Sequence, residues 1–246
     1  MSIRLQNRDI QILKFIFAFR VASYRQILAR YFRDCHRTAA YRRIRDLRKE
    51  NLLKLESTVV NDQSVDYFRI TDQAWQLIKN SWPFDIDTPY FKSESPDHDL
   101  RLSEIFFRME NLKSFRSFMT ENLLQSSSEL KADIKFRDLA KLYADGALVL
   151  KGPDGQTYVY GIELELSKKA RDRYSEKLKS YYKADGIDGV IYIASSQEIS
   201  NALTKSDDTV CTQRDSILYL GSEDDVLKSD KKIYFKNSKA NGIELF

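Results

Sequence analysis

The chain has little of the chemistry that marks several large classes of protein. Only two cysteines occur, Cys35 and Cys211, far apart in the sequence. This scarcity argues against a disulfide framework or a zinc cluster and fits a reducing compartment. No run of 18 apolar residues is present, and the opening residues MSIRLQNRD lack the apolar stretch of a signal peptide. We therefore expect no membrane span and a cytoplasmic location.

Positive charge is concentrated at the N-terminal end. Residues 1–60 contain 14 Lys and Arg against 5 Asp and Glu, a net charge of +9, although the whole chain has a net charge of only +4. A basic, arginine-rich region in a chain whose net charge is otherwise small is typical of a nucleic-acid-binding module. The alternative interpretation is that these side chains form an ordinary solvent-exposed helical surface.

Residues 1–80 show the pattern of a small DNA-binding domain. Asn7 and Ser23 are expected to cap two helices, and a third helix begins near Thr38. Two short runs, Leu53–Val60 and Val65–Thr71, predict a hairpin around a polar turn at 61–64, and a further helix follows. Three helices followed by a hairpin predict a winged helix-turn-helix whose third helix enters the major groove.

The third expected helix contains most of the basic side chains. They would read guanine edges or hold phosphates, and the sequence leaves both open. Tyr41 lies among them and would touch the DNA or pack against the second helix, whereas His36 would contact a phosphate or cap the helix. The DNA contacts expected here are Arg37, Arg42, Arg43, Arg45, Arg48 and Lys49.

The remainder of the chain predicts a linker and a second domain. Residues 81–97 contain three of the four prolines and predict the linker. Residues 98–246 alternate helical and strand patterns, which predicts a mixed sheet and an α/β (α+β) fold class overall. Residues 126–142 are ambiguous between helix and loop. The other elements expected are a helix at about 97–112, a strand within 115–124, helices Ser167–Lys183 and Ser196–Lys205, strands Asp188–Ser195 and Ile217–Gly221, and an edge strand Ile233–Phe235.

Candidate functional residues are most concentrated between residues 143 and 182. The turn GPDG at 152–155 joins two apolar runs and predicts a hairpin that places Asp145 opposite Glu163. Because strand side chains alternate, Glu163 and Glu165 share one face. Three converging carboxylates repel one another, and a hard divalent cation such as Mg²⁺ or Mn²⁺ would relieve that repulsion. The alternatives are a solvent-facing Glu pair and a turn aspartate.

This arrangement resembles the PD-(D/E)xK nuclease superfamily. The resemblance implies a restriction-endonuclease-like domain in which Asp145, Glu163 and Glu165 bind the metal and act in catalysis together with Lys168. The sequence departs from the motif at its lysine, because position 165 is a glutamate. Lys168 follows shortly, and some members carry the basic residue on the next helix, where this chain has Lys177. Backbone contacts to DNA are expected from Arg171, Arg173 and Lys177.

Taken over most of its length, the chain resembles the replication-relaxation family, specifically the MobC-type relaxases of mobilisable plasmids. The features are the winged helix, the linker, a helix that opens with His98, and the segments ADGALVL and GIELELSKKARDRYSEKLKSYY. The resemblance implies a DNA relaxase, a nicking endonuclease that cleaves plasmid transfer-origin DNA in conjugative mobilisation with a metal ion. An accessory mobilisation protein and a coupling protein would be its partners.

Other functions remain open at this point. A histidine-based relaxase is disfavoured because the chain has only two histidines, some sixty residues apart. A covalent tyrosyl link to DNA would use one of the tyrosines nearest the acids: Tyr174, Tyr181 or Tyr182. The glutamate at position 165 favours a non-enzymatic DNA-binding regulator of plasmid replication or transcription with an inactive nuclease-like domain. A restriction or defence nuclease would instead linearise DNA.

Overall fold

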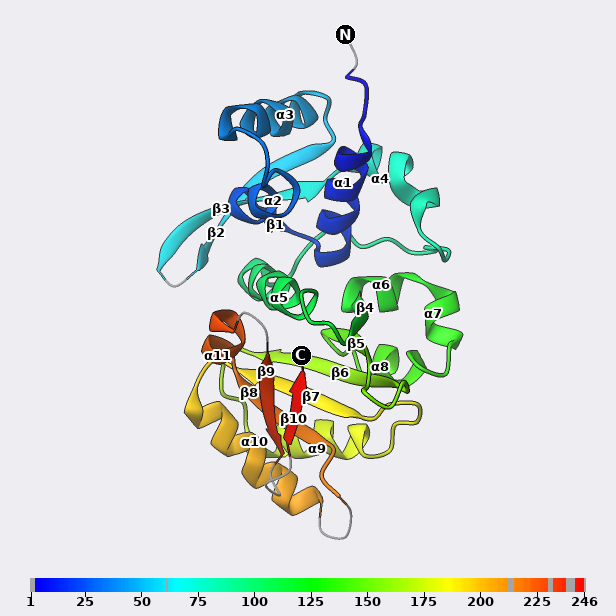
Figure 1. Ribbon diagram of the computed structural model, residues 1–246, viewed down its shortest axis with the longest axis vertical. Helices are drawn as coiled ribbons and strands as arrows, with labels where there is room; N and C mark the ends of the chain where they lie inside the picture. The colour runs from blue at the N-terminus through cyan, green and yellow to red at the C-terminus, as the bar shows by residue number, and fades with distance from the viewer. Residues whose placement is uncertain (1–2, 61, 212–214, 230–231, 238–241, 246) are drawn as a thin grey trace. The chain divides into compact units, whose positions relative to one another are not determined.

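The computed structural model describes residues 3–60, 62–211, 215–229, 232–237 and 242–245. These residues form a mixed α/β protein with two compact units (Figure 1). Unit 1 comprises Met1–Ser103 with Ser126–Ser128, and unit 2 comprises Glu104–Gln125 with Glu129–Phe246. The expected linker at 81–97 is therefore grouped with unit 1, and the division falls inside a helix.

Unit 1 combines short helices with a three-stranded antiparallel sheet in the order β1-β3-β2. The predicted hairpin is confirmed as β2 and β3, although residue 61 of its turn lies outside the described residues. The two-residue strand β1 was not predicted, because two residues are too few for a periodic pattern. The elements are α1 (Asn7–Phe19), β1 (Ala22–Ser23), α2 (Tyr24–Tyr31), α3 (Arg37–Lys49), β2 (Leu53–Val60), β3 (Gln63–Ile70), α4 (Asp72–Ile78) and the 3₁₀ turn η1 (Lys79–Ser81).

Side-chain caps define where these helices begin. Ser23 caps α2 as predicted, since its Oγ accepts a hydrogen bond from the Gln26 N–H at 3.3 Å. The cap of α1 is Gln6 rather than Asn7. The Gln6 N–H donates to Asp9 Oδ2 at 2.7 Å, and an acid three residues after the cap is the signature of a capping box. The position of Asp9 therefore selects Gln6.

Unit 2 is built on a seven-stranded mixed sheet in the order β10-β9-β8-β7-β6-β5-β4. The ambiguous segment 126–142 forms two short helices, α7 and α8. The elements of unit 2 begin with α5 (Pro96–Met109), which spans the division between units. They continue with β4 (Phe115–Thr120), α6 (Glu121–Ser126), α7 (Ser128–Ala132), α8 (Arg137–Lys141), β5 (Gly146–Lys151), β6 (Thr157–Glu165), α9 (Arg171–Tyr181), β7 (Gly189–Ala194), α10 (Gln197–Val210), β8 (Leu218–Ser222), α11 (Glu223–Lys228), β9 (Ile233–Asn237) and β10 (Gly242–Leu245).

The direction of the strands determines where the helices of unit 2 lie. Strands β4, β5 and β6 form an antiparallel meander, and β7 and β8 continue in parallel with β6. Helices α9 and α10 are the two crossover connections, and they lie side by side (Figure 1). Successive right-handed crossovers in one direction place both helices on one face. Strand β7 lies between β6 and β8 and is buried along its whole length, as its apolar run GVIYIA predicts.

Two expectations about unit 2 differ from the structure. The segment Ile233–Phe235 was expected at the sheet edge, but β10 pairs with β9 and forms that edge instead. Strand β10 has only four residues and includes a glycine and a glutamate, so it shows little strand pattern. The helix expected from Ser167 begins at Arg171, which leaves Lys168 and Lys169 in the segment that precedes it.

Candidate functional site

The β5–β6 hairpin brings Asp145 and Glu163 together. Residue 145 immediately precedes β5, and the pair Gly146–Ile162 places it opposite Glu163 in register. Asp145 Oδ2 accepts a hydrogen bond from the Leu164 N–H at 2.7 Å, which orients its carboxylate along β6. The register that the GPDG turn predicted is confirmed.

Glu163 is a carboxylate that is only 13% exposed and is held by two groups of α9. The Tyr181 hydroxyl donates a hydrogen bond to it, and Lys177 Nζ lies 3.1 Å from its Oε1. Lys177 Nζ also donates to the carbonyl of Leu142 at 2.6 Å. Burial, and then the negative charge of Asp145, raise the pKa of Glu163 to about 7, although Lys177 and Tyr181 act in the opposite direction. Two neighbouring carboxylates in a desolvated site are the setting that a divalent cation would relieve.

Glu165 has a different partner. Its Oε2 lies 2.7 Å from Lys169 Nζ, and its side chain is buried. Lys168, expected at the acids, is exposed, and its side chain has no hydrogen bond or ion pair with the described residues. Across those same residues, no group of three His, Cys, Asp or Glu side chains is arranged to hold a metal ion. The ammonium groups at the acids therefore belong to Lys169 and Lys177.

The tyrosines nearest the acids in the sequence have different partners in the structure. Tyr174 and Tyr181 are 2% and 0% exposed, and the Tyr174 hydroxyl accepts a hydrogen bond from the Lys169 N–H at 3.0 Å. Tyr182 belongs to another cluster, since its hydroxyl donates to Asp207 Oδ1 at 2.7 Å. Sequence reasoning missed Tyr192, which pairs with Glu163 across β6 and β7. Burial, followed by the charges of Glu163, Glu165 and Asp145, raises the pKa of Tyr192.

The raised pKa of Glu163 predicts a pH-dependent stability in the absence of metal. An acid whose pKa is raised on folding stabilises the fold below its unfolded pKa, and that stabilisation is lost as the pH rises from about 4.5 to about 7. In EDTA, we expect Glu163→Gln to remove this loss and to raise the free energy of unfolding at pH 8 by ~3 kcal/mol at most.

Urea unfolding at pH 5 and pH 8 measures this effect. Glu176→Gln is the matched control, because Glu176 is an exposed glutamate of α9. An identical pH dependence in the parent and in Glu163→Gln would contradict the prediction.

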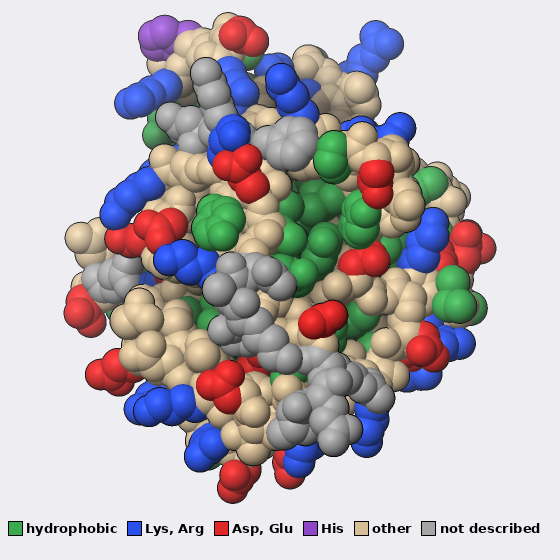
Figure 2. Space-filling view, turned by 60° about the horizontal axis from the view of Figure 1, so that its bottom comes forward, with side chains coloured by type: hydrophobic (Ala, Val, Ile, Leu, Met, Phe, Trp, Pro, Cys, Tyr) green, Lys and Arg blue, Asp and Glu red, His purple; other side chains and the backbone are tan. Residues whose placement is uncertain are grey.

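Helix α3 exposes a face that contains only basic charges. Tyr41 lies on it, 45% exposed, and also packs against Tyr24 of α2 with ring centroids 5.1 Å apart. The face shows no side-chain ion pair within the part of the chain that the structure describes. Its basic members are Arg37, Arg42, Arg45, Arg48 and Lys49. On the face of the molecule in Figure 2, by contrast, basic and acidic side chains are interspersed. His36 caps α3, since its Nδ1 accepts a hydrogen bond from the Thr38 N–H at 3.3 Å.

Arg43 differs from the other arginines of α3. Its Nε donates to Asp9 Oδ1 at 3.0 Å, its Nη2 pairs with Asp9 Oδ2, and the same Nη2 donates to the Arg4 carbonyl at 2.8 Å. Asp9 is fully buried, and this hydrogen-bonded pair raises the pKa of Arg43. Arg43 therefore joins α3 to α1 and points away from the exposed basic face.

Removing Arg43 should destabilise unit 1. Arg43→Ala leaves the buried Asp9 carboxylate without its cation, so we expect the free energy of unfolding to fall by ~3 kcal/mol. Arg42→Ala, one residue earlier and exposed, should change it by less than ~0.5 kcal/mol. Chemical denaturation of both variants measures the difference, and equal values would contradict a structural role for Arg43.

The remaining basic residues predicted to contact DNA lie on α9. Arg171 Nη2 donates to Thr209 Oγ1 of α10 at 2.7 Å, so this side chain ties the two crossover helices together. Arg173 is exposed, and its side chain has no hydrogen bond or ion pair among the described residues. Lys177 is committed to Glu163 and Leu142.

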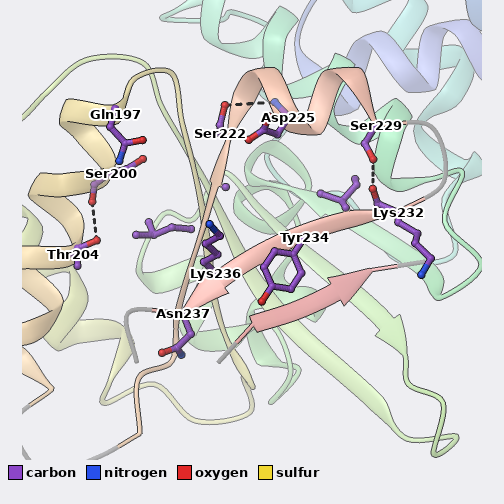
Figure 3. A pocket seen from close by; sticks show the side chains of 13 residues that line it. Gln197, Ser200, Thr204, Ser222, Asp225, Ser229, Lys232, Tyr234, Lys236 and Asn237 are labelled. Atoms are coloured by element: carbon purple, nitrogen blue, oxygen red, sulfur yellow. Dashed lines mark hydrogen bonds between the residues drawn. The ribbon is translucent and has the colours of Figure 1, made fainter. Parts of the chain in front are cut away.

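A separate hollow of about 600 Å³ opens beside α10, β8, α11 and β9. Figure 3 shows Ser200 and Thr204 on α10 and Tyr234 and Lys236 on β9 among the side chains that line it. Lys232 at its rim pairs with Glu244 at 2.8 Å. The hollow contains none of the site residues that the sequence predicted.

No protein-family model, curated protein or solved structure matches this chain. None of the helices in the described ranges is long and apolar enough to cross a lipid bilayer.

Proposed function

We propose that this chain is a metal-dependent DNA endonuclease that nicks one strand, with a PD-(D/E)xK nuclease-like domain in unit 2. The main supporting observation is the pair of carboxylates at Asp145, directly ahead of β5, and Glu163, on β6, where Lys177 contacts Glu163. The order β5, β6, α9, β7, with an acid ahead of β5 and acids on β6, is the order that the sequence resemblance implies.

Asp145 and Glu163 would hold Mg²⁺ or Mn²⁺. When bound, such a cation activates a water molecule and neutralises charge on the scissile phosphate. The Leu164 N–H holds the Asp145 carboxylate in position. Lys177, which contacts Glu163, would take the role of the lysine that is missing at position 165, and its ammonium would stabilise negative charge on the phosphate. Lys169 neutralises Glu165, so that acid plays a smaller part than the sequence suggested.

Unit 1 would supply the DNA-binding surface as a winged helix-turn-helix. Its helices α1, α2 and α3 precede the hairpin of β2 and β3, and the exposed face of α3 is basic and shows no side-chain ion pair among the described residues. A helix with such a face fits the major groove, where its arginines hold phosphates or read guanine edges. The hairpin would be the wing.

The surroundings of Tyr174 and Tyr181 favour hydrolysis over a covalent link to DNA through either of these two tyrosines. Tyr174 and Tyr181 are buried, and the Tyr181 hydroxyl is engaged by Glu163. Burial also raises the pKa of Tyr181 well above its ordinary value, which disfavours the phenolate that would attack a phosphate. A plasmid transfer origin as the target, with an accessory mobilisation protein and a coupling protein as partners, rests on the sequence resemblance alone.

A non-enzymatic DNA-binding regulator is the second candidate. The observation that favours it is the ion pair between Glu165 and Lys169, which occupies the position where the nuclease motif has its lysine. Such a protein would keep the basic face of α3 and lack cleavage.

Incubation of supercoiled plasmid carrying a cloned transfer origin tests the two candidates. Mg²⁺ or Mn²⁺ should convert the plasmid to open circles, and EDTA should prevent the conversion. Tight binding without nicking would favour the regulator, and linear product would favour a restriction-type nuclease.

A further inference from the structure

Tyr143 lies in an unusual backbone conformation directly ahead of the carboxylates. Its φ is +51°, in the left-handed region that bulky residues rarely adopt. Its side chain is 65% exposed, and it has no hydrogen bond, ion pair or ring contact with the described residues. An exposed aromatic ring alone carries little meaning, but a ring held at the surface in a costly conformation calls for a functional explanation.

The conformation follows from the way α8 ends. The Ala144 N–H donates to the Leu139 carbonyl at 3.1 Å, and the Tyr143 N–H donates to the Ala140 carbonyl at 3.2 Å. These two bonds define a Schellman motif, in which the residue at the position of Tyr143 is left-handed and usually glycine. Glycine would avoid the steric cost that tyrosine incurs there.

The other non-glycine residues with positive φ in the described ranges are easier to explain. They are Arg20, Asn51 and Asp62. Asn and Asp tolerate this conformation well. The Arg20 guanidinium lies 3.8 Å from Asp99, so its side chain makes a contact of its own. Tyr143 differs because its ring is left facing solvent.

The segment around Tyr143 is fixed to the carboxylate site on both sides. Lys177 Nζ binds the Leu142 carbonyl on one side and Glu163 on the other. Two residues beyond the ring, the Asp145 carboxylate is held by the Leu164 N–H, and the Asp145 carbonyl accepts a hydrogen bond from the Glu121 N–H at 2.9 Å. The backbone that carries the ring is thus held in place two residues ahead of Asp145.

We propose that Tyr143 is a substrate-contact residue that stacks on an unpaired nucleotide base of the strand held at Asp145 and Glu163. This inference rests on the proposed nuclease function of unit 2. Aromatic rings bind single strands because every base has a face on which to stack.

Binding of a fluorescein-labelled single strand of twenty thymidines tests the proposal, with the full chain in EDTA so that no strand is cut. The background protein carries Arg42→Ala, Arg45→Ala and Arg48→Ala, which removes the basic face of α3 from the measurement. We expect Tyr143→Ala to bind about 5- to 100-fold more weakly than this background and Tyr143→Phe, which keeps the ring, to bind within about twofold of it.

The Tyr143→Gly variant distinguishes a loss of base stacking from a loss of stability. It should bind as weakly as Tyr143→Ala but melt at a higher temperature, because glycine tolerates the positive φ. The proposal is wrong if the Ala variant binds as tightly as the Phe variant, or if the background protein does not bind the oligonucleotide at all. Because no cleavage is needed, these results are independent of whether the protein nicks plasmid DNA.

Discussion

Asp145→Asn and Glu163→Gln should each slow plasmid nicking by about 100-fold or more. Each change removes a carboxylate charge that would hold the metal, and metal-assisted cleavage depends on that charge to stabilise the transition state. Lys177→Ala should also slow nicking strongly, because Lys177 is the ammonium that contacts Glu163. The rate of conversion of supercoiled plasmid to open circles, at saturating Mg²⁺ or Mn²⁺, measures these effects.

Lys168→Ala is the matched control for Lys177→Ala. Lys168 lies in the same basic stretch of sequence but is exposed and does not contact the acids. It should retain most of the nicking rate, as should Tyr→Phe changes at positions 174, 181 and 182.

The melting temperature distinguishes variants that no longer bind the metal from variants that no longer fold. Mg²⁺ or Mn²⁺ should raise the melting temperature of the parent, because ligands that bind the folded state stabilise it, and Asp145→Asn combined with Glu163→Gln should abolish that rise. The mechanism would be refuted by an acid variant that nicks at the parental rate, or by one Tyr→Phe change that alone eliminates nicking.

Replacing Arg42, Arg45 and Arg48 of α3 with Ala together should weaken duplex binding several-hundredfold at 0.1 M salt. If each arginine neutralises one phosphate, the slope of log affinity against log salt should decrease in magnitude by about 2.7. Arg43 is left intact, because its pairing with Asp9 supports the fold. Fluorescence anisotropy with a labelled duplex at several salt concentrations measures both quantities.

A charge-matched variant controls for the change in net charge. Lys113, Lys131 and Lys151 are exposed lysines of unit 2, and replacing all three with Ala removes the same charge away from α3. This variant should keep most of the affinity and of the salt slope. If the two triple variants behaved alike, the binding would reflect general charge and not the face of α3.

Local patterns in the sequence were sufficient for most of the individual elements. Helical periodicity located α1 to α5, and the capping side chain of Ser23 located the start of α2, because these signals involve residues within one or two turns of each other. The placement of Asp145 opposite Glu163 was also predictable, since a tight turn determines the register of the two strands that it joins.

Contacts between elements determined which charged groups lie at the carboxylates of unit 2 and which support the packing of unit 1. The sequence by itself determined a basic N-terminal region, a hairpin bearing acids and a mixed α/β class. Only the tertiary structure selected Lys177 and Lys169 over Lys168 as partners of the acids, assigned Arg43 to Asp9, and placed Tyr192 beside the carboxylates. The physical reason is that hydrophobic and charge patterns report the face of an element, whereas an ion pair depends on how two distant faces pack together.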